Sequence, residues 1–368
     1  MSTNPLVRLG ELGQSPWYDY ITRDLLTSGE LLRLIREDGL RGMTSNPTIF
    51  EKAIAGSRLY DEEIRVLTEQ GKSAGEIFET LAVADVRAAC DLFAPVYQAT
   101  SGVDGLVSLE VSPTLAHDTE GTIHEAERLW QMVDRPNAMI KIPGTRAGLP
   151  AITHCIAAGI SVNVTLLFSV DRYGDVIDAF VEGMDRRLAR SLPLRPIASV
   201  ASFFVSRVDG KVDPQLDARG DPHALRGKIA IANACVAYRL FEQSLRTPRW
   251  SRLAKAEGRP QRPLWASTST KDPRYPDVHY VEPLIAPRTV NTLAPETFAA
   301  YRDHGQPAVR ITEGMAEAPR LLQALTETGV DLSTVTRELE DDGVAKFAAS
   351  YASLLAGIEA KAGALAGR

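Results

Sequence analysis

Residues 138–168, AMIKIPGTRAGLPAITHCIAAGISVNVTLLF, contain two β-rich segments joined by one helical segment. The first, AMIKIP (138–143), and the second, ISVNVTLLF (160–168), are short and apolar, which is typical of buried strands. Between them, LPAITHCIAAG (149–159) has the apolar spacing of a helix. A strand, a helix and a second strand in this order predict a βαβ unit with parallel strands.

The same alternation extends from about residue 16 to about residue 300. Six further β-rich segments are WYDY (17–20), RGMTS (41–45), GLVSLEVS (105–112), IASVASFF (197–204), PLWAST (263–268) and RTVNTL (288–293). Helix-period segments, including 23–38 and 73–97, separate them. Eight strands alternating with helices predict an α/β protein with a single (β/α)8 TIM barrel. The rival architecture is a doubly wound open sheet, but no GxGxxG follows the first strand.

We expect one domain over residues 1–368, with the barrel at about 16–310 and C-terminal helices at about 311–368 packed on it. The Gly-, Pro- and Asp-rich stretch 208–227 predicts an irregular insertion after the sixth strand, either among the functional loops or on the surface without a role. The tail carries an apolar stripe at helical spacing, which either packs on the barrel or caps the active site. The stripe consists of Phe347, Tyr351, Leu354, Leu355 and Ile358.

Composition indicates a soluble cytoplasmic enzyme or binding protein. The chain has 41 Lys and Arg against 47 Asp and Glu, and this net charge of −6 argues against nucleic-acid and membrane partners. No apolar run approaches the roughly 18 residues of a membrane span, and the start MSTNPLVRLG lacks the pattern of a secretory signal. Three widely spaced cysteines fit reduced thiols. The six histidines form no pair with metal-ligand spacing, so we expect no metal site.

A lysine in the fourth strand is the centre of the predicted site. In AMIKIP, Ile140 and Ile142 share one face, so Lys141 points into the barrel if the isoleucines pack on the helices. Burial disfavours the charged ammonium form, and a neutral amine attacks carbonyls to form a Schiff base. A single lysine at a strand end more often reaches along apolar surface to solvent, so its neighbours decide between the two interpretations.

Those neighbours are polar groups at or near the C-terminal ends of other strands, where barrel enzymes keep their chemistry. They are Asp19, Asn46, Glu110, Asn163, Thr165 and Ser202. Any one of them alone is more often a structural group. Gathered around a lysine, they favour a catalytic site.

These strand segments resemble the transaldolase family, in particular its longer bacterial branch. RGMTSNPTIF (41–50) resembles its second-strand signature, and NAMIKIPGT (137–145) resembles its Schiff-base lysine strand. Other segments resemble the family's remaining strands in the same order, and the likeness extends from about residue 17 to about residue 310. These segments are GLVSLEVSPTLA (105–116), ISVNVTLLFS (160–169), ASFFVSRVD (201–209), WASTSTKDPRY (265–275) and TVNTLAPET (289–297).

The resemblance implies a role for each matching residue. Lys141 is expected to form the Schiff base, Asp19 to act as acid and base, and Glu110 with Thr165 to activate a water molecule. Three others, Asn46, Asn163 and Ser202, match positions that bind the ketose hydroxyls. Phosphate-binding positions are matched by Arg207 and Ser267. Many members have Arg two residues after that serine; this chain has Ser269 there, and Lys271 two residues further is assigned to the phosphate.

The implied reaction transfers a dihydroxyacetone unit between sugar phosphates in the non-oxidative pentose phosphate pathway. The donors are sedoheptulose 7-phosphate and fructose 6-phosphate; the acceptors are glyceraldehyde 3-phosphate and erythrose 4-phosphate. No cofactor is needed because the lysine supplies the electron sink, and a monomer or homodimer is expected. Two alternatives stay open: an aldolase that releases free dihydroxyacetone, as fructose 6-phosphate aldolase does, and a non-catalytic sugar-phosphate-binding barrel. In the family, Phe at the position of Phe204 accompanies transfer and Tyr accompanies release.

Overall fold

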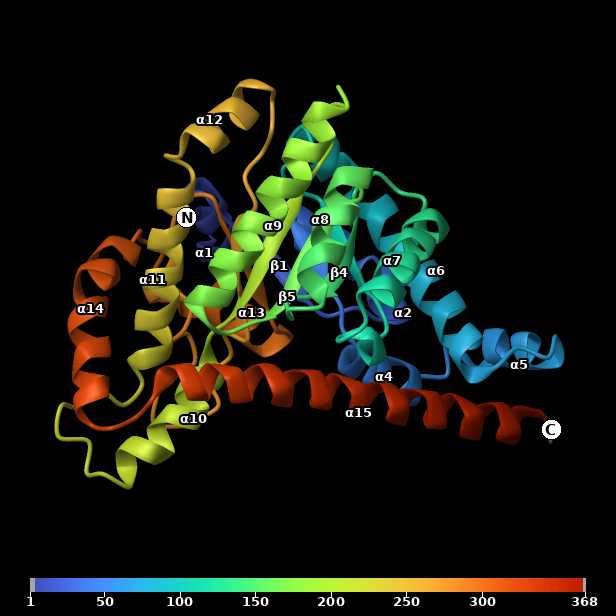
Figure 1. The fold of residues 1–368 in the computed structure, drawn as a ribbon. Coiled ribbons are helices and arrows are strands. Elements are labelled where there is room, and N and C mark those ends of the chain that lie inside the picture. Colours follow the sequence, from blue (N-terminus) through green and yellow to red (C-terminus); the bar gives the residue numbers. More distant parts are fainter. Residues whose placement is uncertain (1–3, 367–368) are drawn as a thin grey trace.

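A closed barrel of eight parallel strands, neighbours in chain order, forms the centre of the molecule (Figure 1). This computed structural model describes residues 4–366, and it confirms the predicted TIM barrel. The strands are β1 (Gln14–Asp19), β2 (Gly42–Thr44), β3 (Leu106–Glu110), β4 (Ala138–Pro143), β5 (Val162–Leu167), β6 (Ser199–Phe204), β7 (Arg262–Ala266) and β8 (Thr289–Leu293). Each of the eight predicted β-rich segments contains or overlaps one of them.

The first strand begins three residues before the predicted segment. Gln14 and Ser15 pair with Thr289 and Val290 of β8, although polar residues gave no strand signal there. The side-chain amide of Gln14 donates to the Leu284 carbonyl at 2.8 Å and to the Thr289 hydroxyl at 3.0 Å. These two hydrogen bonds compensate for the burial of the amide nitrogen, whereas the side-chain oxygen has no partner among the described residues.

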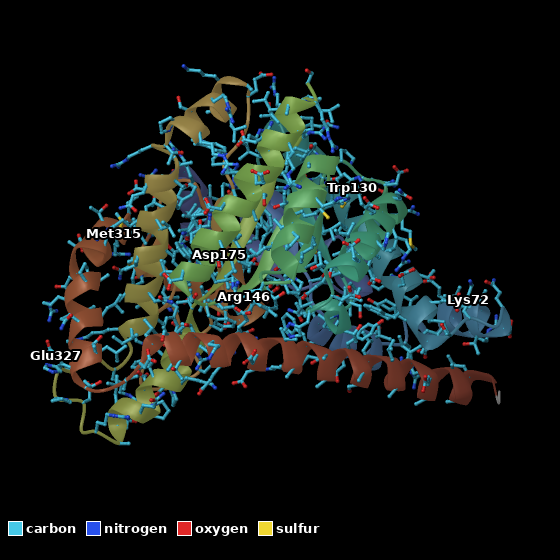
Figure 2. All side chains as sticks on the ribbon, in the orientation of Figure 1. Lys72, Trp130, Arg146, Asp175, Met315 and Glu327 are labelled. Atoms are coloured by element: carbon cyan, nitrogen blue, oxygen red, sulfur yellow. The ribbon has the colours of Figure 1, made fainter. Side chains whose placement is uncertain are left out.

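Helices surround the barrel and connect its strands. They are α1 (Pro5–Glu11), α2 (Arg23–Thr27), α3 (Glu30–Glu37), α4 (Pro47–Ala55), α5 (Asp61–Glu69), α6 (Ala74–Ala99), α7 (Thr119–Val133), α8 (Gly148–Ala158), α9 (Val170–Ala189), α10 (Ser206–Asp217), α11 (Ile229–Ser244), α12 (Pro248–Lys255), α13 (Pro295–His304), α14 (Ile311–Glu327) and α15 (Leu332–Ala366), with 3₁₀ turns η1 (Pro113–Leu115) and η2 (Glu282–Leu284). In Figure 2, Trp130 of α7 and Met315 of α14 mark opposite flanks of this arrangement. In the part of the chain described, no helix is long and apolar enough to cross a membrane.

Two predictions about helices need correction. The segment 23–38 is not one helix, because Gly29 has a φ of +87° and separates α2 from α3. The stretch 208–227 is not irregular throughout, because α10 covers its first half. Its polar composition hid an apolar stripe of Val208, Val212 and Leu216, all buried and four residues apart.

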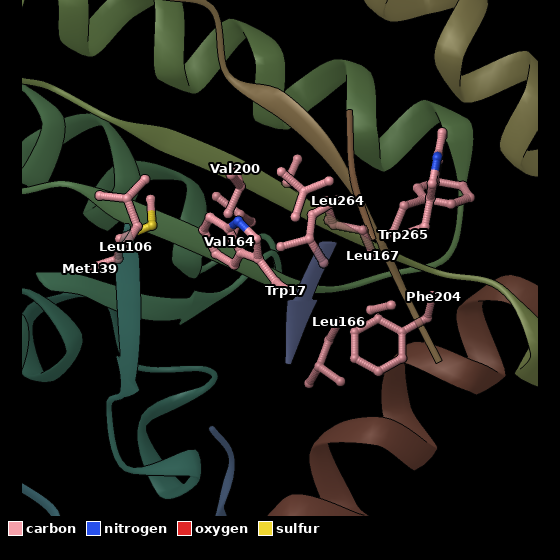
Figure 3. Close-up of a cluster of buried hydrophobic side chains, with 14 of the residues drawn as sticks. Trp17, Leu106, Met139, Val164, Leu166, Leu167, Val200, Phe204, Leu264 and Trp265 are labelled. Atoms are coloured by element: carbon pink, nitrogen blue, oxygen red, sulfur yellow. The ribbon is translucent and has the colours of Figure 1, made fainter. Parts of the chain in front are cut away.

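A layer of apolar side chains lies in the barrel interior, below the C-terminal ends of the strands. Trp17 is fully buried there, and a Cβ on Gly42 would lie 2.4 Å from its ring, so only glycine fits beside it. Figure 3 shows Trp17 with Met139 and Leu264 in this buried cluster. Two residues after Trp17 and Met139 on the same strand faces come Asp19 and Lys141. The interior therefore becomes polar towards the C-terminal ends.

The longest helix, α15, runs across the C-terminal end of the barrel (Figure 1) and packs against α4, α5, α6 and α10. The helix α12 lies at the other end in the same view. There, Trp250 and Ala254 share a separate cavity with Ser15, Leu106 and Ser199, which lie at or near strand starts. The two ends of the barrel thus carry different surfaces.

Candidate active site

A cavity of about 650 Å³ opens at the C-terminal end of the barrel, beneath α15. This volume lies within the ordinary range for a small-molecule site. Nine of the eleven predicted site residues line it; Glu110 and Asn163 do not. The nine are Asp19, Asn46, Lys141, Thr165, Ser202, Phe204, Arg207, Ser267 and Lys271.

Lys141 points into this cavity from β4, as its strand parity predicts. Its residue surface is 4% exposed, and its Nζ donates to the Ser45 carbonyl oxygen at 3.1 Å. The Nζ also lies 5.8 Å from the centre of the Phe347 ring. The amine is therefore buried, and it lines the same cavity as Phe347 of α15.

Glu110 pairs with Lys141 across neighbouring strands. Its Oε2 lies 3.3 Å from the lysine Nζ, and burial raises the pKa of the Glu110 carboxyl, an effect that the lysine charge opposes. Glu110 lines a separate small cavity of about 30 Å³, shared with Ser45, Asn46 and Tyr351. Neither of its oxygens has a well-aligned hydrogen-bond donor among the described residues, and the same holds for the Thr165 hydroxyl.

Asp19 faces the cavity from the end of β1. The Thr44 hydroxyl donates to its Oδ1 at 2.6 Å and lies equally close to the Thr292 hydroxyl. Burial raises the pKa of Asp19 above its ordinary value, while the Lys141 charge and the Thr44 hydrogen bond act in the opposite direction. A carboxyl with a raised pKa in a cleft is suited to proton transfer.

Asn46 holds its place because it also begins a helix. Its Oδ1 accepts from the Ile49 backbone N–H at 3.0 Å, and Pro47 occupies the first helical position of α4. The cap uses the side-chain oxygen. Asn46 also lines the cavity, and its amide nitrogen takes no part in the cap and remains available as a donor.

Asn163 lies behind the cavity wall rather than in it. It is fully buried, its Oδ1 accepts from the Ser202 hydroxyl at 2.7 Å, and its Nδ2 donates to the Ser108 hydroxyl at 3.0 Å. This chain of hydrogen bonds joins β3, β5 and β6. In this arrangement Asn163 orients Ser202, and Ser202 itself lines the cavity.

A cationic corner of the cavity forms where β6 and β7 end. The Arg207 guanidinium carbon lies 5.0 Å from the centre of the Phe204 ring, and burial lowers the pKa of Arg207. Ser267 has a φ of +54°, and its hydroxyl lies 3.0 Å from that of Ser206. Lys271 and Ser269 both line this cavity. Lys271 is exposed. Ser269 is buried, and its hydroxyl lies 3.4 Å from a carboxylate oxygen of Glu296.

Several cavity residues were not predicted. Thr44 and Thr292 lie beside Asp19, Glu296 lies beside Ser269, and α15 contributes four residues. The parity of Thr44 in RGMTS was the only available signal for the first group. The α15 residues are Leu339, Asp342, Lys346 and Phe347.

Within residues 4–366, no three His, Cys, Asp or Glu side chains gather as metal ligands do.

Comparison with known proteins places this cavity in a family context. A family model described as transaldolase/fructose-6-phosphate aldolase matches residues 16–358. A protein named transaldolase from Parafrankia sp. (strain EAN1pec) is 52% identical over 367 residues, which cover 99% of this chain and 100% of that protein. Transaldolase 1 of Streptomyces avermitilis is 48% identical over 99% of this chain and 96% of its own length. Transaldolase 2 of Nostoc sp. (strain PCC 7120) is 46% identical over 98% of both chains.

Proposed function

Because the chain belongs to the transaldolase/fructose-6-phosphate aldolase family, we propose that it is a transaldolase. In this function it transfers a dihydroxyacetone unit from a ketose phosphate to an aldose phosphate. The observation that carries the proposal is the buried amine of Lys141, which lies 3.3 Å from Glu110 Oε2 and lines the same polar cavity as Asp19. Relatives matched over nearly their full length, named transaldolase, support it.

The first step makes the covalent intermediate. The unprotonated Nζ of Lys141 attacks the ketose C2 carbonyl, and loss of water from the resulting carbinolamine leaves an iminium. Glu110, 3.3 Å from Nζ, takes up and returns protons through a water molecule during these steps. Its two oxygens and the Thr165 hydroxyl are buried without well-aligned partners, so they have hydrogen-bonding capacity to hold that water.

The second step breaks the C3–C4 bond. Asp19 takes the proton of the C4 hydroxyl, the C3–C4 electron pair moves towards the iminium, and the aldose leaves as an aldehyde. The three-carbon unit stays on Lys141 as an enamine. Its C3 carbon then attacks the carbonyl of the acceptor aldose, Asp19 returns the proton, and hydrolysis of the iminium frees the amine.

Binding groups fit the rest of the substrate. The Asn46 amide and the Ser202 hydroxyl face the cavity and bind sugar hydroxyls. At the cationic corner, Arg207, Ser267 and Lys271 bind the phosphate. The expected substrates are sedoheptulose 7-phosphate or fructose 6-phosphate, with glyceraldehyde 3-phosphate or erythrose 4-phosphate as acceptor. We propose a cytoplasmic monomer or homodimer.

The two alternatives differ from this proposal in what the site does with the enamine. An aldolase protonates it and releases dihydroxyacetone; the apolar Phe204 ring in the cavity favours transfer instead. A non-catalytic barrel needs neither the lysine nor the carboxyls, and this chain retains all three.

Reductive trapping tests the proposal. Incubation with fructose 6-phosphate and borohydride should leave a reduced three-carbon adduct on Lys141, detected by peptide mass spectrometry. Activity with fructose 6-phosphate and erythrose 4-phosphate should yield a seven-carbon ketose phosphate. An adduct on another lysine, or an unmodified protein, contradicts the mechanism; free dihydroxyacetone without transfer favours the aldolase.

A further inference from the structure

The helix α15 is held firmly over the cavity. Gly343 lets it approach the barrel closely, because a Cβ there would lie 2.9 Å from Leu166. On one side of this contact Asp342 pairs with Lys211 at 2.8 Å, and on the other Ser350 hydrogen-bonds Thr48 at 2.8 Å. The face between these anchors is therefore fixed relative to the strand ends.

That face carries a cation into the cationic corner. Lys346 lines the cavity together with Arg207 and Lys271. The charge of Arg207 is the main reason that the pKa of Lys346 lies below its ordinary value, followed by burial and by the charge of Lys271. The side chains thus lie close enough to repel one another.

The described carboxylates leave this repulsion uncompensated at short range. Within residues 4–366, none of the three side chains has a carboxylate oxygen within 4.0 Å of its nitrogens. The nearest turn of α15 carries Asp342, but Asp342 pairs with Lys211 instead. Asp19 acts on Arg207 only from beyond ion-pair distance.

We infer that Lys346 is a third cation of the phosphate site, so that the C-terminal helix binds the phosphate of the substrate directly. This inference rests on the proposed function for the identity of the ligand. Three cations brought together without a partner favour a doubly charged anion, because binding replaces mutual repulsion with charge-assisted hydrogen bonds. Lys346, like Lys271, is exposed, but it lies on a helix docked over the strand ends, whereas Lys271 lies on a loop.

The test compares phosphate binding by the parent protein and Lys346→Met. Inorganic phosphate is titrated by calorimetry, and half-saturation of borohydride trapping is measured with fructose 6-phosphate and with dihydroxyacetone. Because Lys346 is exposed, loss of its charged contact should weaken the binding of phosphate and of fructose 6-phosphate by about 10-fold, near the lower end for such bonds. The ratio of half-saturation for fructose 6-phosphate to that for dihydroxyacetone should rise by a similar factor.

Two variants control the comparison. Lys346→Arg keeps the charge and should retain most of the phosphate affinity. Lys255→Met, on α12 at the far end of the barrel, makes the same change in net charge and should leave phosphate binding as in the parent.

Unchanged phosphate affinity in Lys346→Met, or an equal loss for dihydroxyacetone, overturns the inference. If the parent binds phosphate but traps no adduct, the proposed function fails while the role of Lys346 is still decided by the phosphate titration.

Discussion

The Nζ of Lys141 lies 3.3 Å from Oε2 of Glu110, and about 5% or less of either side chain is exposed. A buried pair of this kind contributes little net stability, because desolvation of both charges opposes their attraction. Its consequence is chemical: the carboxylate lies where it can exchange protons with the amine. The pair joins β3 to β4 at the level where the cavity begins.

Replacement of Lys141 by Met should abolish turnover, since no other lysine among the described residues is buried. The fold should persist, because burial raises the pKa of Glu110 and the unpaired carboxyl can remain protonated. Activity assays, circular dichroism and borohydride trapping check this. Substantial activity in the variant, or a trapped adduct on a different lysine, would remove Lys141 from the mechanism.

Replacement of Arg207 by Ala should weaken the binding of phosphorylated substrates far more than the binding of dihydroxyacetone. A hydrogen bond from a guanidinium to phosphate contributes about 1.5–3 kcal/mol, or roughly 10- to 150-fold in affinity. Half-saturation for fructose 6-phosphate and for dihydroxyacetone gives the comparison. Lys271→Ala should show a smaller loss of the same sign. Equal losses for both substrates would make Arg207 a structural residue, packed on Phe204.

Replacement of Phe204 by Tyr should increase release of dihydroxyacetone relative to transfer. The Phe204 ring lines the cavity, and a phenol there can donate a proton or hold a water, so the enamine is protonated before an acceptor arrives. Free dihydroxyacetone is measured after feeding fructose 6-phosphate without acceptor. If the variant releases no more than the parent yet still transfers, another residue controls the partition.

Much of the fold and the centre of the site could be predicted from strand periodicity. Parity along a strand decides which face a side chain takes, so Lys141, Asp19 and Ser202 were placed correctly. Periodicity does not show how deep a residue lies. Asn163 therefore has the right parity but sits one layer below the cavity, where Ser108 and Ser202 occupy its amide.

Contacts between distant segments escaped prediction for a different reason. The hydrogen bond from Thr44 to Asp19 depends on how β1 and β2 pair, which neither segment encodes alone. The apolar stripe of the tail indicated a packed helix but not its register over the barrel. Phe347 was named as part of that stripe, while Lys346 beside it carried no signal until α15 was placed over the strand ends.

The pH dependence should report the state of Asp19. The proposed base must be unprotonated, and burial raises its pKa, so kcat/KM should fall with decreasing pH at a value above the roughly 3.9 of an ordinary aspartate. The same shift means that ionising Asp19 opposes folding, and this cost appears as pH rises through its folded pKa. Asp19→Asn should lose most activity, and its residual rate should lack that acidic limb. If the kcat/KM of the parent falls only at the pKa of an ordinary aspartate, Asp19 is not the base. The same conclusion follows if Asp19→Asn keeps the acidic limb of the parent.

The hydrogen bond from Thr44 to Asp19 should set the pH at which kcat/KM falls on the acidic side. Its hydroxyl donates to Asp19 at 2.6 Å, which favours the charged carboxylate and lowers its pKa. Thr44→Val removes the donor, so the pKa of Asp19 should rise and the acidic limb of kcat/KM should move to higher pH. Activity should therefore fall more at pH 6 than at pH 8, and the free energy of unfolding should drop by about 1 kcal/mol for the lost hydrogen bond.

Two matched variants separate this effect from a general disturbance of the barrel. Thr44→Ser keeps the hydroxyl and should restore the parental pH profile. Thr292→Val removes the other neighbour of the Thr44 hydroxyl, at the same 2.6 Å, but leaves the bond to Asp19 in place. Its limb should stay close to that of the parent because the carboxylate keeps its donor. Equal displacement of the limb in Thr44→Val and Thr292→Val would mean that packing at the β1–β8 edge, and not the donated hydrogen bond, controls the acidity of Asp19.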